Sequence, residues 1–333
     1  MKNLYLIRNL LSLKAAKAID EQYHSNESIY SIIEGNSQLS NIIISNLNEN
    51  KDSIVPTINF RLYKVGINIF KQRKNIGDAK KEIEIKLRGL SVSKLFITYP
   101  MHFDSYMYYL TARKMGITIC FYEEGPCFYR GGLTKQYEIK NTKDLLRKIY
   151  YSMCGLRRGY DFKADCWYSS LPIKDKHKSI RLQYERVQLP LDVKYVFLSR
   201  PVSDDYQELD IRDEVNAIMK FYNLACGSDP LYIKFHPRES DLKRSQIRNM
   251  LFKSNINIKI LEKDCPSEDI IYSMKNGAVC GYDTTTLVYA NNINDKIEVY
   301  SVLKSIAVKD TTGFLLECYE EYKLKYKHIR MCD

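Results

Sequence analysis

Short apolar runs that alternate with helical segments are the feature that most restricts how this chain can fold. Residues 94–98 (Lys-Leu-Phe-Ile-Thr) predict a buried strand, residues 104–115 a helix that stops at Gly116, and residues 117–122 a second strand. Parallel strands need a crossover of this kind, usually a helix, whereas antiparallel strands can be joined by a tight turn. The pattern is therefore typical of a doubly wound α/β sheet.

The same alternation begins again in the second half of the chain. Strands are predicted at 194–198, 231–235, 258–261 and 278–280, and helices at 208–225, 241–253, 267–275 and 284–290. At the N-terminus we expect a strand at 3–7, a helix to residue 23 and a strand at 27–32, whereas 41–86 show only weak helical periodicity.

These two series predict two domains of the α/β class. We expect Rossmann-like domains at 1–180 and 181–312 that face a central cleft, followed by a C-terminal helix at 313–333. Residues 142–185 are basic and rich in tyrosine, and we interpret them as the interdomain connection. Such an architecture does not by itself give a function.

The charge of the chain indicates a polyanionic partner without naming one. Among 333 residues, 51 are Lys or Arg and 40 are Asp or Glu, which gives a formal net charge of +11. Nucleic acid, an acidic membrane surface, an acidic glycan and a nucleotide all fit that excess, and so does a basic solvated surface. The sequence has no arginine-rich arm, zinc-finger spacing or RNP-type signature.

Cysteine usage and hydropathy predict the compartment. The nine cysteines include no CxxC pair and read as buried free thiols in a reducing environment. No apolar run approaches the ~20 residues of a membrane span, and Arg8 and Lys14 interrupt the apolar N-terminus. We expect a cytoplasmic protein, with peripheral contact to the inner membrane and a homodimer left open.

Three predicted strands end in residues that could carry chemistry. Glu123-Glu124-Gly125 follows the strand at 117–122, where a carboxylate suits a general base and the glycine lets the backbone approach a ligand. The alternative is a solvated acidic turn. His236-Pro237 follows the strand at 231–235, and the proline holds the histidine in extended geometry. That histidine could bind a phosphate or could be purely structural.

The third strand end is Gly281-Tyr282-Asp283-Thr284-Thr285-Thr286. Here hydroxyl groups meet a helix N-terminus, which could hold a phosphate or could be an ordinary cap. Two weaker candidates are Glu268, which could bind a ribose or cap a short helix, and the loop Ser199-Arg200. His102 follows the strand at 94–98 and could contact a substrate, although a helix-entry role fits it better.

The order of these motifs resembles the bacterial sialyltransferases, which share a D/E-D/E-G motif, an HP motif and a later Ser/Thr pair on a GT-B fold. The resemblance extends over residues 90–290, and Thr284-Thr285 stands where Ser-Ser or Ser-Thr is common. It implies transfer of sialic acid from CMP-sialic acid to a hydroxyl of a bacterial surface glycan, such as lipooligosaccharide, O-antigen or capsule. The implied reaction is inverting and uses no metal or cofactor, and the sequence contains no DxD motif.

The resemblance also implies a role for each motif. Glu123 would be the general base, with Glu124 in reserve, and Gly125 would be one of the residues that bind the CMP-sugar. His236, oriented by Pro237, would contact the CMP phosphate and assist its departure. The remaining implied contacts with the donor are the phosphate contacts Thr284, Thr285 and Thr286, the ribose contact Glu268, and the loop residues Ser199 and Arg200.

Two alternatives stay open at this point. A transferase of another CMP-activated acidic sugar, such as Kdo or legionaminic acid, would carry the same motifs. A non-catalytic protein that binds nucleic acid would explain the charge and the 27 tyrosines, which can stack on bases. It would not explain why acidic, histidine and threonine motifs all follow strands, so we expect no nucleic-acid partner. Arg238 and Glu239 read as ordinary surface charge.

Overall fold

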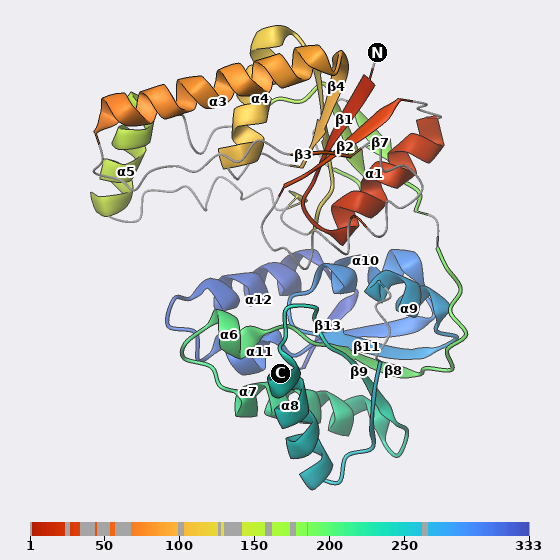
Figure 1. Ribbon diagram of the computed structural model, residues 1–333. Helices are drawn as coiled ribbons and strands as arrows, with labels where there is room; N and C mark the ends of the chain where they lie inside the picture. Colours follow the sequence, from red (N-terminus) through yellow and green to blue (C-terminus); the bar gives the residue numbers. More distant parts are fainter. Residues whose placement is uncertain are drawn as a thin grey trace. The chain divides into compact units, whose positions relative to one another are not determined.

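The computed structural model describes most of the chain (Figure 1). The described residues are 2–23, 27–33, 44, 54–56, 68–98, 103–125, 128–129, 142–156, 162–173, 178–184, 186–261 and 266–332. The chain divides into two compact units, Met1–Glu185 and Arg186–Asp333. Each unit is built on a parallel sheet covered by helices, so the predicted α/β class with two Rossmann-like domains is confirmed. We had expected the boundary after residue 180.

The first unit contains a seven-stranded sheet among its described residues. Its order is β3-β2-β1-β4-β5-β6-β7, and every described pair is parallel. The strands are β1 (Lys2–Ile7), β2 (Ser28–Ile32), β3 (Ile54–Pro56), β4 (Val92–Ile97), β5 (Thr118–Tyr122), β6 (Cys166–Ser169) and β7 (Ser179–Arg181). The helices are α1 (Leu10–Tyr23), α3 (Ile69–Gly89), α4 (Phe103–Met115) and α5 (Thr142–Met153).

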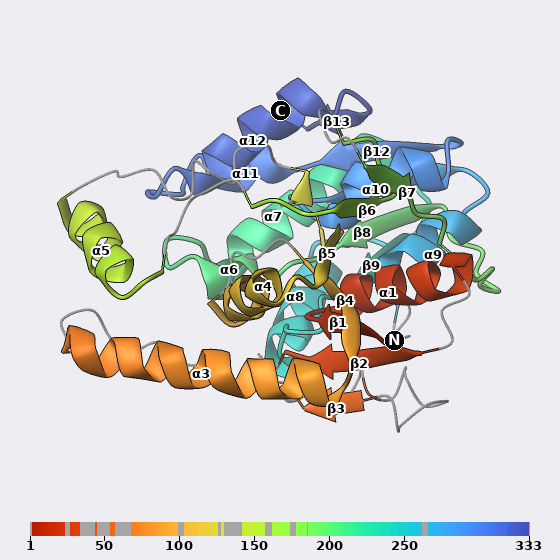
Figure 2. The same cartoon turned by 90° about the horizontal axis from the view of Figure 1, so that it is seen from above.

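Strand β1 shows how this sheet divides its core between two faces. Leu4 and Leu6 pack in one apolar cluster with residues of α3, α4 and α5, whereas Tyr5 and Ile7 pack in another with residues of α1. Successive side chains of a strand point to opposite faces, so helices must cover both sides of the sheet. Figure 1 and Figure 2 also show α5 beside the N-terminal end of α3.

Among its described residues, the second unit contains a six-stranded parallel sheet of order β10-β9-β8-β11-β12-β13. Its strands are β8 (Tyr195–Leu198), β9 (Leu231–Lys234), β10 (Ile258–Ile260), β11 (Gly277–Gly281), β12 (Ile297–Ser301) and β13 (Ile329–Met331). Its helical segments are α6 (Val202–Asp205), α7 (Ile211–Phe221), the π-helical turn η4 (Tyr222–Cys226), α8 (Asp241–Lys253), α9 (Ser267–Ser273), α10 (Thr285–Ile293), α11 (Leu303–Ala307) and α12 (Phe314–Lys325).

Helix starts in this unit follow their capping residues. The Asp210 side chain accepts the N–H groups of Arg212 and Asp213, and Asp213 bonds back to the Asp210 N–H, which completes a capping box at α7. Ser240 caps α8 in a similar way, since its hydroxyl accepts the Lys243 N–H.

Three sequence expectations differ from the structure. The interpretation of 142–185 as a connection is wrong, because this segment supplies α5, β6 and β7 to the first unit. The segment 313–333 contains α12, but β13 follows it and pairs with β12. Residues 69–89, expected to be only weakly helical, form the long helix α3.

The structure also bears on the expectations for the cysteines, for a membrane span and for a metal site. The seven described cysteines are free thiols, and all of them except Cys166 are buried. His102, Cys127 and Cys265 lie outside the described residues. None of the described helices has both the length and the apolar character needed to cross a membrane. The described part of the chain also contains no cluster of three or more His, Cys, Asp or Glu side chains that could hold a metal ion.

Candidate functional site

The first unit has its topological switch point between β1 and β4, where the strand order reverses. Ligands of doubly wound sheets bind beside such a point, at the carboxyl ends of the strands. Arg8 follows β1, Thr98 follows β4, and Glu123 and Glu124 follow β5. The acidic pair therefore lies at the end of the sheet where a ligand is expected.

Glu123 is a fully buried carboxylate with donors from its own unit. The hydroxyls of Tyr129 and Tyr184 donate to it, and Ser170 donates its N–H at 3.0 Å and its hydroxyl at 3.1 Å. Burial raises the pKa of Glu123, and these donors oppose the rise. Ser170 follows β6 and Tyr184 follows β7, so the Glu123 side chain faces away from the switch point.

Glu124 has the opposite surroundings. It is partly exposed, and its backbone carbonyl accepts a hydrogen bond from Asn9 at 3.1 Å. Burial raises its pKa, the charge of Arg8 and a hydrogen bond with Thr98 lower it, and Asp104 raises it. Arg8 and Thr98 follow the two strands of the switch point, so Glu124 is the member of the acidic pair that faces it.

Gly125 has a φ angle of 152°, which residues with a side chain rarely adopt. The chain can therefore turn directly after the acidic pair, as the glycine in the predicted motif requires. Gly125 is itself buried.

The second unit repeats this geometry with different chemistry. Its switch point lies between β8 and β11, and β9 is the other neighbour of β8. Ser199 and Arg200 follow β8, His236 and Pro237 come after β9, and Thr284 comes after β11. Three of the sequence-predicted groups are therefore brought to adjacent strand ends.

His236 is partly buried, and its imidazole has one nitrogen engaged. Its Nδ1 accepts the backbone N–H of Arg238 at 3.1 Å, so in the neutral ring Nε2 carries the proton. Burial and the charges of Arg238, Arg200 and Lys234 lower its pKa to about 4, with Asp205 opposing. At neutral pH the ring is thus an uncharged hydrogen-bond donor. Pro237, exposed beside it, begins the turn.

Arg200 supplies the positive charge at this switch point. Its guanidinium pairs with Asp283, lies 3.6 Å from Asp205 and bonds the Tyr206 hydroxyl at 3.5 Å. Although burial opposes its charge, Asp283 and Tyr206 raise the pKa of Arg200 above its ordinary value. Two carboxylates compensate the charge of Arg200, but a guanidinium has five N–H donors, and a donor of this kind beside a neutral imidazole donor suits an anionic ligand.

The three threonines occupy different positions at the start of α10. Thr284 is the N-cap, yet its side chain makes no cap bond, and its buried Oγ1 has no partner among the described residues. Thr285 is partly exposed in the first turn. The buried Thr286 hydroxyl donates to Glu268 at 2.8 Å, so these two predicted donor contacts bond each other.

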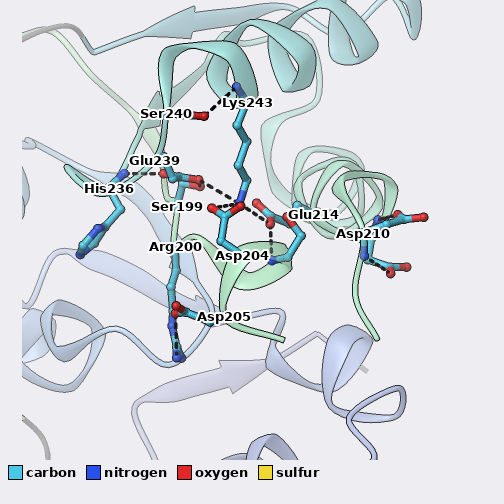
Figure 3. Close-up of polar contacts among 12 residues, drawn as sticks. Ser199, Arg200, Asp204, Asp205, Asp210, Glu214, His236, Glu239, Ser240 and Lys243 are labelled. Carbon is cyan, nitrogen blue, oxygen red and sulfur yellow. Dashed lines mark hydrogen bonds and ion pairs between the residues drawn. The ribbon is translucent and has the colours of Figure 1, made fainter. Parts of the chain in front are cut away.

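Sequence reasoning missed Glu239, and its interpretation as surface charge is wrong. Glu239 is only 3% exposed and accepts hydrogen bonds from the Ser199 hydroxyl at 2.8 Å and the His236 N–H at 2.5 Å (Figure 3). The Ser199 hydroxyl is therefore engaged inside the protein. Arg238 is exposed and pairs with Asp205. A glutamate three residues after the histidine, directly before a serine N-cap, was the available signal.

Comparison with protein families finds a match within the second unit. Residues 188–303 match the model of the alpha-2,8-polysialyltransferase family (POLYST). That segment contains β8, β9 and β11 and all the second-unit residues named above. No protein of curated function matches the sequence.

Solved structures are similar to this chain in fold. A UDP-GlcNAc 2-epimerase from Methanocaldococcus jannaschii, in complex with UDP-GlcNAc and UDP, matches with a TM-score of 0.53 and 13% identity, over 98% of this chain and 93% of that chain. MurG from Acinetobacter baumannii matches with a TM-score of 0.52 and 12% identity, over 100% of this chain and 85% of that chain. These likenesses show the two-domain GT-B type of fold.

Proposed function

We propose that this protein is a sialyltransferase that moves sialic acid from CMP-sialic acid to a hydroxyl of a bacterial surface glycan, with inversion and without a metal. One observation carries the proposal. Three adjacent strand ends of the second unit bring together a neutral imidazole donor, a guanidinium and a buried threonine hydroxyl that has no partner among the described residues. The polysialyltransferase family match falls on the same segment and supports the sialyl donor.

The proposed donor site suits the single phosphate of CMP. Departure of CMP builds negative charge on that phosphate, and fixed donors stabilise such charge without reorganising. His236 would donate from Nε2, Arg200 would supply charge, and Thr284 with the N-terminus of α10 would supply further donors. Thr285 lies in the first turn of that helix and would add a hydroxyl, whereas Glu268 and Thr286 would contact the donor only if their mutual bond opens.

On the acceptor side, the proposal takes Glu124 as the general base. The resemblance implied Glu123, with Glu124 in reserve. Glu123, however, is fully buried and holds its protein donors, whereas Glu124 is partly exposed and faces the switch point. Burial raises the pKa of Glu124, and a carboxylate with a raised pKa takes a proton from a sugar hydroxyl more effectively.

Nucleotide binding provides the first test. We expect CMP to stabilise the protein in a thermal-shift titration with CMP, CDP, UMP and ATP, and we expect calorimetry to show one CMP site. Stabilisation by UMP or ATP in preference to CMP would overturn the proposal. Salt-sensitive binding of single-stranded nucleic acid without CMP binding would favour the nucleic-acid alternative.

A transfer assay then identifies the sugar. CMP-sialic acid, CMP-Kdo and CMP-legionaminic acid should be offered in competition with galactoside and sialoside acceptors, because all three release CMP. Mass spectrometry and linkage analysis of the product should show sialic acid in an inverted linkage. Transfer of only one of the other two sugars would instead identify the protein as a transferase of that CMP-activated sugar.

A membrane contact, which would bring the enzyme to a glycolipid acceptor, is part of the proposal, and α5 offers the surface. Its apolar side chains Leu146 and Ile149 are 60% and 47% exposed, beside exposed Arg147 and Lys148. A helix with exposed apolar and basic residues binds the interface of an anionic bilayer. Co-sedimentation with phosphatidylglycerol vesicles should fall in the Leu146→Ser/Ile149→Ser variant. If the variant instead keeps vesicle binding and light scattering shows that it has lost a dimer, this face binds a second copy of the chain.

A further inference from the structure

A buried carboxylate joins the two loops that carry His236 and Arg200. The β8–β9 ladder ends where the Ser199 N–H donates to the Lys234 carbonyl at 2.9 Å. Beyond that point the Glu239 carboxylate continues the connection, with Oε1 bonded to Ser199 and Oε2 bonded to the backbone of His236 (Figure 3). One side chain thus fixes both strand ends.

A second layer of charge holds this carboxylate in place. The Lys243 ammonium, from α8, lies 4.0 Å from Glu239 Oε1, 2.7 Å from Glu214 and 3.1 Å from Asp204. Lys243 and Glu214 are both buried. Glu214 Oε1 also accepts the Ser203 N–H at 2.7 Å, at the start of α6. The network therefore anchors the loop at residues 236–239, which we call the HP loop, to α6, α7 and α8.

We propose that Glu239 is a positioning residue of the donor site, which sets the backbone of His236 and of the Ser199-Arg200 segment so that imidazole and guanidinium serve one phosphate. This inference rests on the proposed function. Glu239 itself contacts no ligand in this proposal, because it is buried and both its oxygens bond to the protein. Figure 3 shows the side chains of His236 and Arg200 extending away from it.

The protonation state of Glu239 shapes the choice of test variants. Burial and Glu214 raise its pKa to about 7, whereas Ser199, the His236 N–H and Lys243 act against the rise. Tyr282 lies close to Glu214 and Glu239, and the charges of both glutamates raise its pKa. A protonated carboxyl keeps one acceptor for the His236 N–H and can donate to the Ser199 hydroxyl. Glutamine also has one acceptor for the His236 N–H and one donor for the Ser199 hydroxyl, so Glu239→Gln is the conservative variant. Glu239→Ala removes both hydrogen bonds.

Nuclear magnetic resonance of the histidine side chains tests the inference without nucleotide. In the wild type, His236 should show a proton on Nε2 and a pKa of about 4, and the spectrum of His236→Ala identifies its signals. Glu239→Ala should release the turn and move this pKa towards the ordinary 6.5, whereas Glu239→Gln should leave it low. Ser273→Ala is the matched control, because it removes a buried hydroxyl of the same unit far along the chain from both loops.

CMP affinity gives the second readout, as a double-mutant cycle. Glu239→Ala should weaken CMP binding about tenfold in the wild type and by less than about threefold in His236→Ala, because interacting residues are not additive. Glu239→Gln should restore most of the affinity. Thermal unfolding of each variant shows whether it is folded. If Glu239→Ala does not fold, Glu239→Gln still tests the inference, because a folded Glu239→Gln that loses the low pKa of His236 would contradict it.

The outcomes separate this inference from the proposed function. If the wild type does not bind CMP, the proposed function fails, while the histidine spectra still test Glu239. If the wild type binds CMP, the inference is overturned by a folded Glu239→Ala that keeps the tautomer and pKa of His236. Independent, multiplying effects of Glu239→Ala and His236→Ala on CMP affinity would overturn it as well.

Discussion

The two units have the same strand order around their switch points and opposite chemistry there. In the first unit, β2-β1-β4-β5 places Arg8 beside Glu124, and in the second, β9-β8-β11-β12 places His236 near Arg200 and Thr284. The topology fixes where a ligand can bind, and the first three residues after each strand decide which ligand. In the proposed function, a carboxylate site and a phosphate site thus share one kind of scaffold.

The buried glutamates sharpen this contrast. Glu123 is surrounded by hydroxyl and N–H donors, whereas Glu239 lies near Lys243 and Glu214. Burial raises the pKa of both carboxyls. Only Glu239 connects two strand ends of its own switch region, so we expect its replacement to affect binding, and replacement of Glu123 to affect mainly stability.

The largest expected effect separates Glu124 from Glu123. Glu124→Gln should lower kcat by about 10²–10⁴, the usual contribution of a general base, with unchanged CMP affinity. Glu123→Gln is the matched control, and it should lose less than about tenfold in kcat while its unfolding temperature falls, since a buried acceptor is removed. Steady-state kinetics and thermal unfolding measure both. Equal kcat losses with equal stability would contradict the comparison.

The next effect concerns the phosphate side. His236→Ala should lower kcat by about 10²–10³, as loss of one oriented donor to a developing negative charge usually does. Unlike Glu124→Gln, it should also weaken CMP binding, which calorimetry measures. Full turnover in His236→Ala would remove the imidazole from the donor site.

The pH dependence of stability should distinguish the two titrating groups of the HP loop. Glu239, with a pKa of about 7 against an ordinary 4.5, contributes stability that is present below pH 4.5 and lost as pH rises through 7. His236, with a pKa of about 4 against 6.5, contributes stability that is present above pH 6.5 and lost as pH falls through 4. The two trends oppose each other between pH 4.5 and 6.5.

Urea unfolding at a series of pH values separates them. The stability of Glu239→Gln relative to the wild type should rise between pH 4.5 and 7, by up to about 3 kcal/mol. The stability of His236→Asn relative to the wild type should rise as pH falls from 6.5 to 4. Parallel curves for the wild type and both variants would show that neither group titrates in these ranges.

The smallest effect concerns the threonines. Thr284→Ala should weaken CMP binding by less than about tenfold at little cost in stability, because its Oγ1 has no partner among the described residues. Thr286→Val should instead cost about 1 kcal/mol of unfolding free energy, because its hydroxyl bonds Glu268. Calorimetry and urea unfolding compare the pair. A large stability loss in Thr284→Ala would show that its hydroxyl has a partner outside the described residues.

Much of the fold could be predicted because strands and helices with clear periodicity carry it. Helix α8 was predicted at 241–253 and is found there, and β5 differs from its prediction by one residue. Helix α3 was harder, because its buried stripe is narrow and includes the polar Gln72. Strands β6 and β7 are short and lie in a basic segment, so composition hid them.

The site was predictable in position and less so in its contacts. The predicted strand ends indicate Glu123 in the first unit and His236 and Thr284 in the second, because the carboxyl ends of parallel strands meet at one edge of each sheet. Which of two adjacent glutamates faces the switch point depends on Tyr129 and Tyr184, which lie elsewhere in the sequence. The surroundings of Glu239 depend likewise on Ser199 and Glu214, which only the tertiary structure brings to it, whereas Lys243 is four residues away in the sequence.

The parallel pairing of the described strands has a consequence for how the chain reaches its native state. A parallel pair cannot close through a tight turn, so each pair must wait for a crossover to form. β1 and β4, for example, pair although they are separated by β2, β3 and α3 in sequence. Such non-local pairing slows folding and leaves strand edges open in the meantime. Production of this protein should therefore improve with slow synthesis at low temperature and with chaperones.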